Sequence, residues 1–543
     1  MAESFASFRS QRLSRPLKRR EDKLAGQHGN TQVPKMLGVL MQYIYTGEPS
    51  AGTAAEFFWD AVVKHHTYAT GGHGKDEYFG PPNQLAERVD GRTDESCNVY
   101  NMLKMTRRLF AIHPDIKYAD FEERALFNHV LASIDPEDGR TCYMVPVGRG
   151  VRHEYQEMSR DFTCCVGSGM ESHSLHGDGV YYESGDRLWI NLYVPSVANW
   201  KAAGATVTMT TTFPEGDAAS LKLTLQRQKS FTLALRRPSW AGDGFAVKVN
   251  GKSVMALAGP GSYVELKRTW RSGDTVSLVL PKKLHVEELA DNERSAALMW
   301  GPLVLAGDLG PERRGGPTES PALVTADKPV TEWLQPMRDS LGVFRTVGVG
   351  RGTDGQTSEV DFVPFYRLHR RTYSVYWDLY TNESWATKIE ELNAERARQQ
   401  KLEAATVAYV PPGDLEKEKT FYSKSEASAP DRISGRVGRR SKKWFSYELP
   451  VDAARPMALV VTLNTEERAK RTFEILVDGQ RIGDGVIERY PPGSPTGRFY
   501  DVDYKIPASL VKDKQKVTVR FQATGGNETA TVFGIRLVHA EER

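Results

Sequence analysis

The spacing of apolar residues changes along this chain, and that change limits the fold more than any other feature of the sequence. Up to about residue 134 apolar residues recur every three or four positions, as at Phe57, Phe58 and Ala61, which is typical of amphipathic helices. From about residue 180 they alternate with polar residues, as at Leu221 and Leu223, which is typical of β-strands. We therefore predict a multidomain chain, α first and then β, with β-sandwiches in its second part.

The length and local composition suggest where the domains begin and end. A chain of 543 residues is too long for one hydrophobic core. Residues 383–405 are rich in Glu, Ala, Arg and Gln and predict a charged helical linker. We expect five segments: a disordered basic N-terminus (1–20), a helical domain (21–180), a β-sandwich (181–310), a mixed β segment with the helical linker (311–405) and a C-terminal β-sandwich (406–543).

Charge and hydropathy exclude several classes of partner. The net charge of +3 is small for this length, so the sequence predicts no nucleic-acid surface. No run of 18 apolar residues is present, so no transmembrane helix and no membrane partner are expected. The first 23 residues are basic but contain no apolar segment of the kind that signal peptides need. We expect the chain as it stands to be cytoplasmic, with export of a longer parent protein as the alternative.

Three of the four cysteines lie next to other candidate metal ligands. Cys97 follows Glu95 by two positions, and Cys164 and Cys165 are adjacent, whereas Cys142 stands apart. Four cysteines are too few for a disulfide scaffold. One carboxylate and three thiolates suit zinc, which takes such ligands in tetrahedral geometry. The alternatives are four unrelated residues, some of them buried as small apolar side chains, or a strained disulfide between Cys164 and Cys165.

The spacing of these ligands predicts their local structure. Adjacent residues point in different directions from a regular helix or strand, so we expect Cys164 and Cys165 on an irregular loop that Gly167 and Gly169 permit. Residues two apart do not share a helix face. Glu95 and the cysteine that follows it should therefore lie just before a helix that begins near Asn98, where a helix N-terminus favours negative charge.

Three longer runs resemble one known family. The segments HGNTQVPK (28–35), YATGG (68–72) and FTCCVGSGMES (162–172) are similar to those of the bacterial β-L-arabinofuranosidases, which are zinc-dependent retaining glycoside hydrolases with a cysteine nucleophile. The resemblance covers residues 21–310 and extends more loosely through the β-rich remainder, as in the multi-domain branch of the group. It implies that the helical region is part of an (α/α)6 barrel.

The resemblance also assigns roles to particular residues. The zinc ligands of the family match Glu95, Cys97, Cys164 and Cys165. The nucleophile matches Cys164, the general acid/base matches Glu77, and the sugar contacts match His28 and Tyr143. Cys142 has no counterpart and is interpreted as a packed thiol. Because double displacement needs two facing groups, the Cys164 sulfur and the Glu77 carboxylate should lie about 4–7 Å apart in one cavity, with Cys97 and Cys165 behind the metal.

The substrate that the resemblance implies is a plant glycan with terminal β-L-arabinofuranosyl residues. Relatives carry a longer helical segment before the position of His28, so we expect the barrel of this chain to lack its N-terminal half. The chain would then be a fragment with weak activity, or a partner or second copy would complete the barrel. Two other functions remain open: a carbohydrate-binding protein with a structural zinc site, and a glycosidase of different specificity built on the same site.

Overall fold

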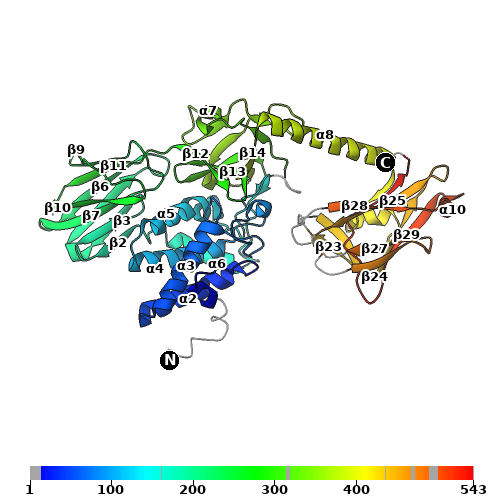
Figure 1. The fold of residues 1–543 in the computed structure, drawn as a ribbon, viewed down its shortest axis with the longest axis horizontal. Coiled ribbons are helices and arrows are strands. Elements are labelled where there is room, and N and C mark those ends of the chain that lie inside the picture. Colours follow the sequence, from blue (N-terminus) through cyan, green and yellow to red (C-terminus); the bar gives the residue numbers. More distant parts are fainter. Residues whose placement is uncertain are drawn as a thin grey trace. The chain divides into compact units, whose positions relative to one another are not determined.

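The computed structural model describes residues 14–160, 162–312, 318–433, 436–465, 467, 471–487 and 499–541. The chain forms two compact units, one ending at Trp385 and the other beginning at Ala386 (Figure 1). Most of the expected disordered segment, residues 1–20, lies outside the described residues. Within it, Leu17 is buried in the core of the helical region. No described helix combines the length and the apolar character needed to cross a membrane.

The first unit begins with a group of packed helices. They are α2 (Gly29–Thr46), α3 (Pro49–His65), α4 (Ser96–Ile112), α5 (Ile116–Ala125) and α6 (Cys164–Ser174). Helix α5 continues into a π-helical turn (Leu126–Val130) and a 3-10 turn (Leu131–Ser133). Side chains at helical spacing form one apolar core, including Met36, Phe58, Trp59, Met102 and Phe110. Helices followed by β-sheet domains are the arrangement that the sequence predicts.

The helical region is less continuous than its periodicity suggests. Gly47 ends α2 with a φ of 71°, and the Glu48 side chain accepts a hydrogen bond from the Ser50 amide and so caps α3. Residues 66–95 contain no α-helix, only a short 3-10 turn (Ala86–Arg88). This long connection carries Glu77, and it ends at Glu95, where α4 begins.

Two sheets then pack face to face. The first has the strand order β4-β5-β6-β11-β8-β9 and the second has β10-β7-β3-β2. Their apolar faces enclose a core that includes Leu221, Leu233 and Trp270. The strand bounds are β2 (Tyr181–Ser184), β3 (Arg187–Ile190), β4 (Ser196–Trp200), β5 (Ala205–Thr211), β6 (Ala218–Leu225), β7 (Lys229–Arg237), β8 (Ala246–Val249), β9 (Lys252–Ser253), β10 (Ser262–Trp270) and β11 (Thr275–Val279).

A third sheet crosses the domain boundary that we expected at residue 310. Strand β13 (Asn292–Trp300) pairs with β12 (Leu284–Leu289) and β14 (Leu303–Pro311), but also with β21 (Tyr376–Tyr380). The first sandwich thus ends near residue 280, because residues of the strands that follow pair far along the chain, as Ser295 does with Asp378 and Gly307 with Ser374. The remaining elements are β1 (Val151–Arg152), β15 (Ala322–Val324), α7 (Val330–Trp333), β16 (Leu334–Pro336), β17 (Phe344–Thr346), β18 (Gly350–Arg351), β19 (Asp361–Pro364) and β20 (Arg371–Ser374).

The second unit is another two-sheet sandwich. Helix α8 (Asn382–Ala405), which the composition predicts, begins in the first unit and leads into the second. One sheet has the order β22-β30-β25-β28 and the other β23-β24-β29-β26-β27. The bounds are β22 (Thr406–Val410), α9 (Leu415–Thr420), β23 (Lys424–Ile433), β24 (Arg436–Pro450), β25 (Met457–Asn464), β26 (Arg471–Val477), β27 (Gln480–Ile487), β28 (Phe499–Lys505), α10 (Ala508–Val511), β29 (Lys516–Ala523) and β30 (Gly534–His539).

Helix α5 joins the three parts of the first unit through buried ion pairs. Arg236 on β7 is fully buried and contacts Asp120 at 2.6 Å and, through its other terminal nitrogen, Glu123. The indole of Trp240 donates a second hydrogen bond to Glu123 at 2.7 Å. Burial raises the pKa of the Glu123 carboxyl, and the arginine opposes that shift. The helix is therefore fixed to the first sandwich by one multiply bonded arginine.

The next residue of α5 binds the third sheet. Arg124 makes two parallel hydrogen bonds of 2.6 Å to Glu287 on β12 and a third, of 3.1 Å, to the Ala69 carbonyl. Glu122 accepts a 2.6 Å hydrogen bond from Arg107 on α4. Helix, sandwich and third sheet thus meet at three successive side chains of α5.

Replacement of Arg236 by methionine should destabilise the first unit by about 3–5 kcal/mol, because Glu123 would be left buried without its counter-charge. Urea unfolding followed by intrinsic fluorescence measures the change. The matched control is Arg187→Met, since Arg187 forms an exposed pair with Glu265, and such a pair contributes less than about 1 kcal/mol. Equal destabilisation by the two changes would contradict this account.

Buried histidines should make the fold acid-labile. Burial lowers the pKa values of His73, His129 and His153 to about 3, whereas unfolded histidine titrates near 6.5. Between these values the native state binds fewer protons than the unfolded state. The stability is therefore complete above about pH 6.5 and is lost as the pH falls toward 3.

Substituting His153 by phenylalanine tests this linkage. The ring of His153 stacks among those of Tyr155 and Phe365, so phenylalanine preserves the packing. The slope of unfolding free energy against pH, measured between pH 6 and 4, should fall by up to about 1.4 kcal/mol per pH unit. His113→Phe, at an exposed position, should leave the slope unchanged. An unchanged slope in the His153 variant would show that this ring is not held neutral.

Candidate metal centre and active site

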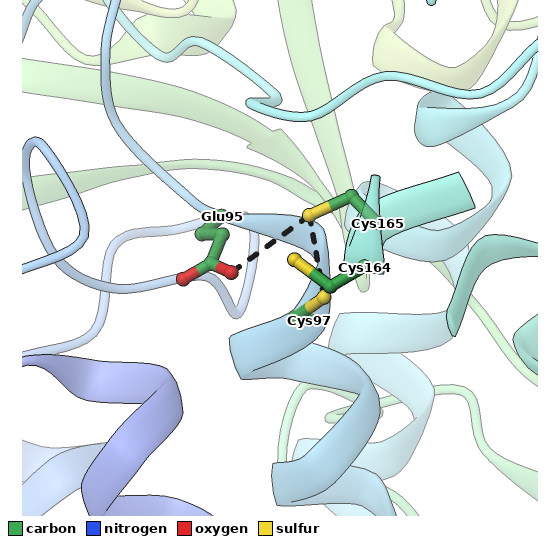
Figure 2. Close-up of side chains that lie close together, drawn as sticks. All are labelled: Glu95, Cys97, Cys164 and Cys165. Carbon is green, nitrogen blue, oxygen red and sulfur yellow. Dashed lines mark hydrogen bonds between the residues drawn. The ribbon is translucent and has the colours of Figure 1, made fainter. Parts of the chain in front are cut away.

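Two helix N-termini bring four metal-ligating side chains together (Figure 2). Glu95 is the N-cap of α4 and Cys97 lies in its first turn, while Cys164 and Cys165 begin α6. One donor atom from each residue lies within 4.8 Å of all the others. The Cys97 and Cys165 sulfurs are 3.3 Å apart, and the Cys165 sulfur lies 3.8 Å from Glu95 Oε1. The four residues singled out in the sequence therefore form one cluster.

The local structure of the paired cysteines differs from the predicted irregular loop. Cys164 and Cys165 are the first two residues of a regular helix, and Gly167 and Gly169 are helical as well. In the first turn successive side chains diverge by about 100°, so both can still reach a point in front of the helix N-terminus. The flexibility of Gly169 is not what is needed there. A side chain at Gly169 would lie 2.7 Å from Thr141, so this glycine permits close packing of α6.

Helix α4 also begins earlier than expected, at Ser96 instead of near Asn98. Cys97 is therefore helical, and Glu95 alone precedes the helix. The expected electrostatic role of the helix N-terminus is unaffected. The positive ends of α4 and α6 both point at the cluster, where they favour carboxylate and thiolate.

The four ligands differ in exposure. Glu95, Cys97 and Cys165 are 1%, 3% and 0% exposed, whereas Cys164 is exposed. All four cysteines are free thiols, so Cys164 and Cys165 do not form a disulfide. Cys142 is buried in a separate apolar core and takes no part in the cluster. One thiol is thus open to solvent while the other donors are enclosed.

The donor set fits a zinc ion. Zinc–sulfur bonds of about 2.3 Å in a tetrahedron place sulfurs about 3.8 Å apart, near the separations seen here. The Oε2 atom of Glu95 is buried and has no hydrogen-bond partner among the described residues. Burial, followed by the nearby Cys97, raises the pKa of Glu95 to about 8. A cation at this position would supply the positive counter-charge that the buried carboxylate lacks.

Glu77, the expected acid/base, is held by both of the predicted sugar-contacting residues. His28 Nε2 lies 3.0 Å from one oxygen of Glu77, and the Tyr143 hydroxyl donates a hydrogen bond to the other. Burial, together with the bond to Glu77, raises the pKa of the Tyr143 hydroxyl, so the phenol stays protonated. The contacts of His28 and Tyr143 with the carboxylate are a feature that the sequence does not reveal.

The backbone at Glu77 is strained. Asp76 and Glu77 have φ values of 49° and 72°, in the left-handed region that residues other than glycine seldom occupy. The Glu77 carbonyl accepts a 2.7 Å hydrogen bond from the Gly29 amide, and the Asp76 amide donates to the Arg92 carbonyl at 2.9 Å. These bonds fix the turn that presents the carboxylate.

Tyr143 connects the two halves of the site. Its carbonyl accepts a 3.0 Å hydrogen bond from the Ser96 amide, next to Glu95, while its hydroxyl binds Glu77. The charges of Glu95 and Cys164 both raise the pKa of its phenol. The candidate acid/base and the four-residue cluster thus both lie near one tyrosine. The expected separation of 4–7 Å between the Cys164 sulfur and the Glu77 carboxylate stays a prediction.

Two supporting interactions were not predicted. The Ser168 hydroxyl lies 3.0 Å from the Cys97 sulfur, and Ser168 follows Cys164 by one helical turn, a spacing that could have suggested it. Thr70 donates a 2.6 Å hydrogen bond to the buried Asp94, next to Glu95. A side chain at Gly72 would lie 2.3 Å from Asp94, which explains why glycine occupies this position in the run Thr70–Gly72.

Different parts of the chain match different protein families, and these parts correspond to the helical region, the first sandwich and the second unit. Residues 4–178 match the family described as β-L-arabinofuranosidase, GH127 catalytic domain, and residues 187–282 match the GH127 middle domain. The chain belongs to the GH127 β-L-arabinofuranosidase family. Residues 401–538 match a family of unknown function, DUF6805.

The individual GH127 proteins that match this chain have low sequence identity to it. A non-reducing end β-L-arabinofuranosidase of Bifidobacterium longum subsp. longum is 25% identical over 287 residues, which are 48% of this chain and 43% of that protein. The chain thus spans less than half of that relative's length. The crystal structure of a GH127 β-L-arabinofuranosidase from Geobacillus stearothermophilus T6 matches with 22% identity and a TM-score of 0.52, over 66% of this chain and 62% of that one. Another GH127 β-arabinofuranosidase matches with 22% identity and a TM-score of 0.55, over 66% and 61%. These structures show that the fold is that of the GH127 proteins.

The purified protein should bind about one zinc ion per chain after metal-free preparation and zinc re-addition, because its four donors fit a single tetrahedral site. Elemental analysis measures the content. Cys97→Ser should lower it, since a buried ligand is removed, whereas Cys142→Ser should leave it unchanged. Absence of zinc from the wild-type protein, or equal loss in both variants, would contradict the assignment.

Proposed function

We propose that this GH127 chain hydrolyses β-L-arabinofuranosides with retention of configuration, with Cys164 as nucleophile and Glu77 as general acid/base. The observation that supports this most directly is the Glu77 carboxylate: His28 and Tyr143 hold it, and its charge helps to raise the pKa of Glu95, a member of the cluster that contains the exposed Cys164. A site that only bound zinc for stability would have no need of this carboxylate. Family membership supports the substrate class.

The reaction would proceed in two displacements. The Cys164 thiolate attacks the anomeric carbon, and Glu77 donates its proton to the departing glycosidic oxygen. Glu77 then removes a proton from water, the resulting hydroxide attacks the same carbon, and the carbon–sulfur bond breaks to return the thiolate. Two inversions give net retention. Each step uses one group on each side of the sugar.

The other residues would prepare these two groups. Glu95, Cys97, Cys164 and Cys165 would hold a zinc ion, whose positive charge would keep the thiols deprotonated at neutral pH. Tyr143, protonated throughout, donates to one Glu77 oxygen and leaves the other within reach of His28. Ser168 binds the Cys97 sulfur, and this favours Cys97 as a fixed ligand over a nucleophile.

The proposed substrates are plant glycans that end in β-L-arabinofuranosyl residues. A different glycoside on the same site is an outcome that the assay below would reveal. A second candidate function is a binding protein with a structural zinc site, which the complete four-ligand set favours. Reactivity of Cys164 separates the two functions.

Kinetics on an aryl β-L-arabinofuranoside test the proposed roles. Cys164→Ser should abolish turnover. Glu77→Gln should lower the rate more for poor leaving groups than for good ones, by about 10²–10⁴-fold for the former, because those need the proton most. Mass spectrometry of the acid-quenched enzyme should show one pentosyl group on Cys164.

The control is Cys142→Ser, which changes a thiol outside the cluster and should leave kcat near normal. Near-normal activity of Cys164→Ala with zinc still bound would refute the nucleophile assignment and favour a structural zinc. Turnover of another glycoside in preference to the arabinofuranoside would correct the substrate.

A further inference from the structure

The outer face of one sheet in the second unit carries an ordered set of polar side chains around a tryptophan. The sheet is β23-β24-β29-β26-β27. Its inner face supplies core residues such as Phe445, Ile475 and Phe521. Because side chains alternate along a strand, the residues between them, including Trp444, face outward.

One row crosses all five strands of this face. Register places Glu426 opposite Trp444, Trp444 opposite Gln522, Gln522 opposite Glu474, and Glu474 opposite Asp484. Glu426 is paired with Lys443, and Glu474 and Asp484 are paired with Arg481, but the three acidic side chains remain 51%, 34% and 47% exposed. With strands about 4.8 Å apart, the row is about 19 Å long. It therefore offers room for several sugar residues.

The neighbouring row carries bases. Lys424, Ser446, Arg520, Leu476 and Arg481 are successive partners across the same strands. The two rows together hold three carboxylates and three bases. A polyanion or a polycation would meet repulsion as often as attraction there. A neutral polyol suits the face better, because its hydroxyls can donate to the carboxylates and accept from the bases and from an amide.

The tryptophan is held in a fixed orientation. The guanidinium of Arg520 stacks 4.1 Å from the centre of the Trp444 ring, and the indole nitrogen donates a 3.0 Å hydrogen bond to Glu426. The ring is only half-buried. A fixed, partly exposed indole flanked by hydrogen-bonding groups provides a flat apolar surface for the C–H face of a sugar.

From these observations we infer that the second unit binds a neutral oligosaccharide along the two rows around Trp444. The rows belong wholly to β23, β24, β29, β26 and β27, so this site needs no contribution from the first unit. The inference is also independent of the hydrolytic mechanism, since none of its residues belongs to the metal cluster.

Affinity electrophoresis of the full chain tests this, with arabinan and arabinoxylan as neutral probes and polygalacturonate as an anionic probe. At least one neutral polysaccharide should retard the wild-type protein, with little change when salt is added. Trp444→Ala should weaken that binding at least tenfold, whereas Trp444→Phe should preserve most of it. Glu77→Gln should bind normally, and loss of binding in its Trp444→Ala double variant would place the binding outside the proposed catalytic site.

Tyr409→Ala is the matched control, because Arg536 stacks on the Tyr409 ring at the same distance of 4.1 Å, but on the other sheet. It should bind like the wild type. Lack of retardation by both neutral probes would overturn the inference. Equal loss in the Trp444→Ala and Tyr409→Ala variants would also overturn it, as would salt-sensitive retardation by polygalacturonate alone.

Discussion

The buried charges of α5 are the interaction on which the first unit depends. Glu123 contacts the sandwich through Arg236, Arg124 contacts the third sheet through Glu287, and Glu122 contacts α4 through Arg107. The Arg236–Glu123 and Arg107–Glu122 pairs are nearly enclosed, so loss of one partner would leave a charge in a poorly solvated place, whereas the Arg124–Glu287 pair is doubly hydrogen-bonded but partly exposed. The directional bonds of these pairs add to the apolar packing in specifying one arrangement of the three layers.

That arrangement also determines the shape of the candidate site. Arg124 binds the Ala69 carbonyl, and a side chain at Gly71 would lie 2.9 Å from the backbone of Ala125. The loop formed by residues 69–72 thus packs against α5 on one side. On its other side Thr70 holds Asp94, the residue before Glu95. Since α4 begins at Ser96, the positions of the candidate ligands Glu95 and Cys97 follow from the same contacts that join the domains.

The sequence predicted side-chain chemistry better than it predicted long-range pairing. The period of apolar residues predicted the order of helices and strands. The four candidate ligands could be identified because the chemical character of each side chain can be read directly from the sequence. The partners of β13 could not be read in this way, since alternation shows that a strand exists but not which strand lies beside it. The helical position of Cys164 was not predicted, because adjacent side chains diverge in the middle of a helix, whereas at the first turn both can reach a point in front of the helix. His28 and Tyr143 were expected near the sugar, yet their contacts with Glu77 join residues 49 and 66 positions apart, and no local pattern records such contacts.

The unequal burial of the thiols gives the proposed chemistry its direction. A metal held by four enclosed ligands resists exchange but offers no nucleophile, whereas an open thiolate without a metal would be largely protonated at neutral pH. Here Glu95, Cys97 and Cys165 are enclosed and Cys164 is exposed. In the proposed reaction Glu95, Cys97 and Cys165 would hold the ion, and the sulfur of Cys164 would carry the sugar. The Ser168 hydrogen bond to Cys97 and the positive N-termini of α4 and α6 would stabilise negative charge on the enclosed donors. In the proposed mechanism, access and hydrogen bonding therefore select the nucleophile, since all three cysteines of the cluster have the same side-chain chemistry.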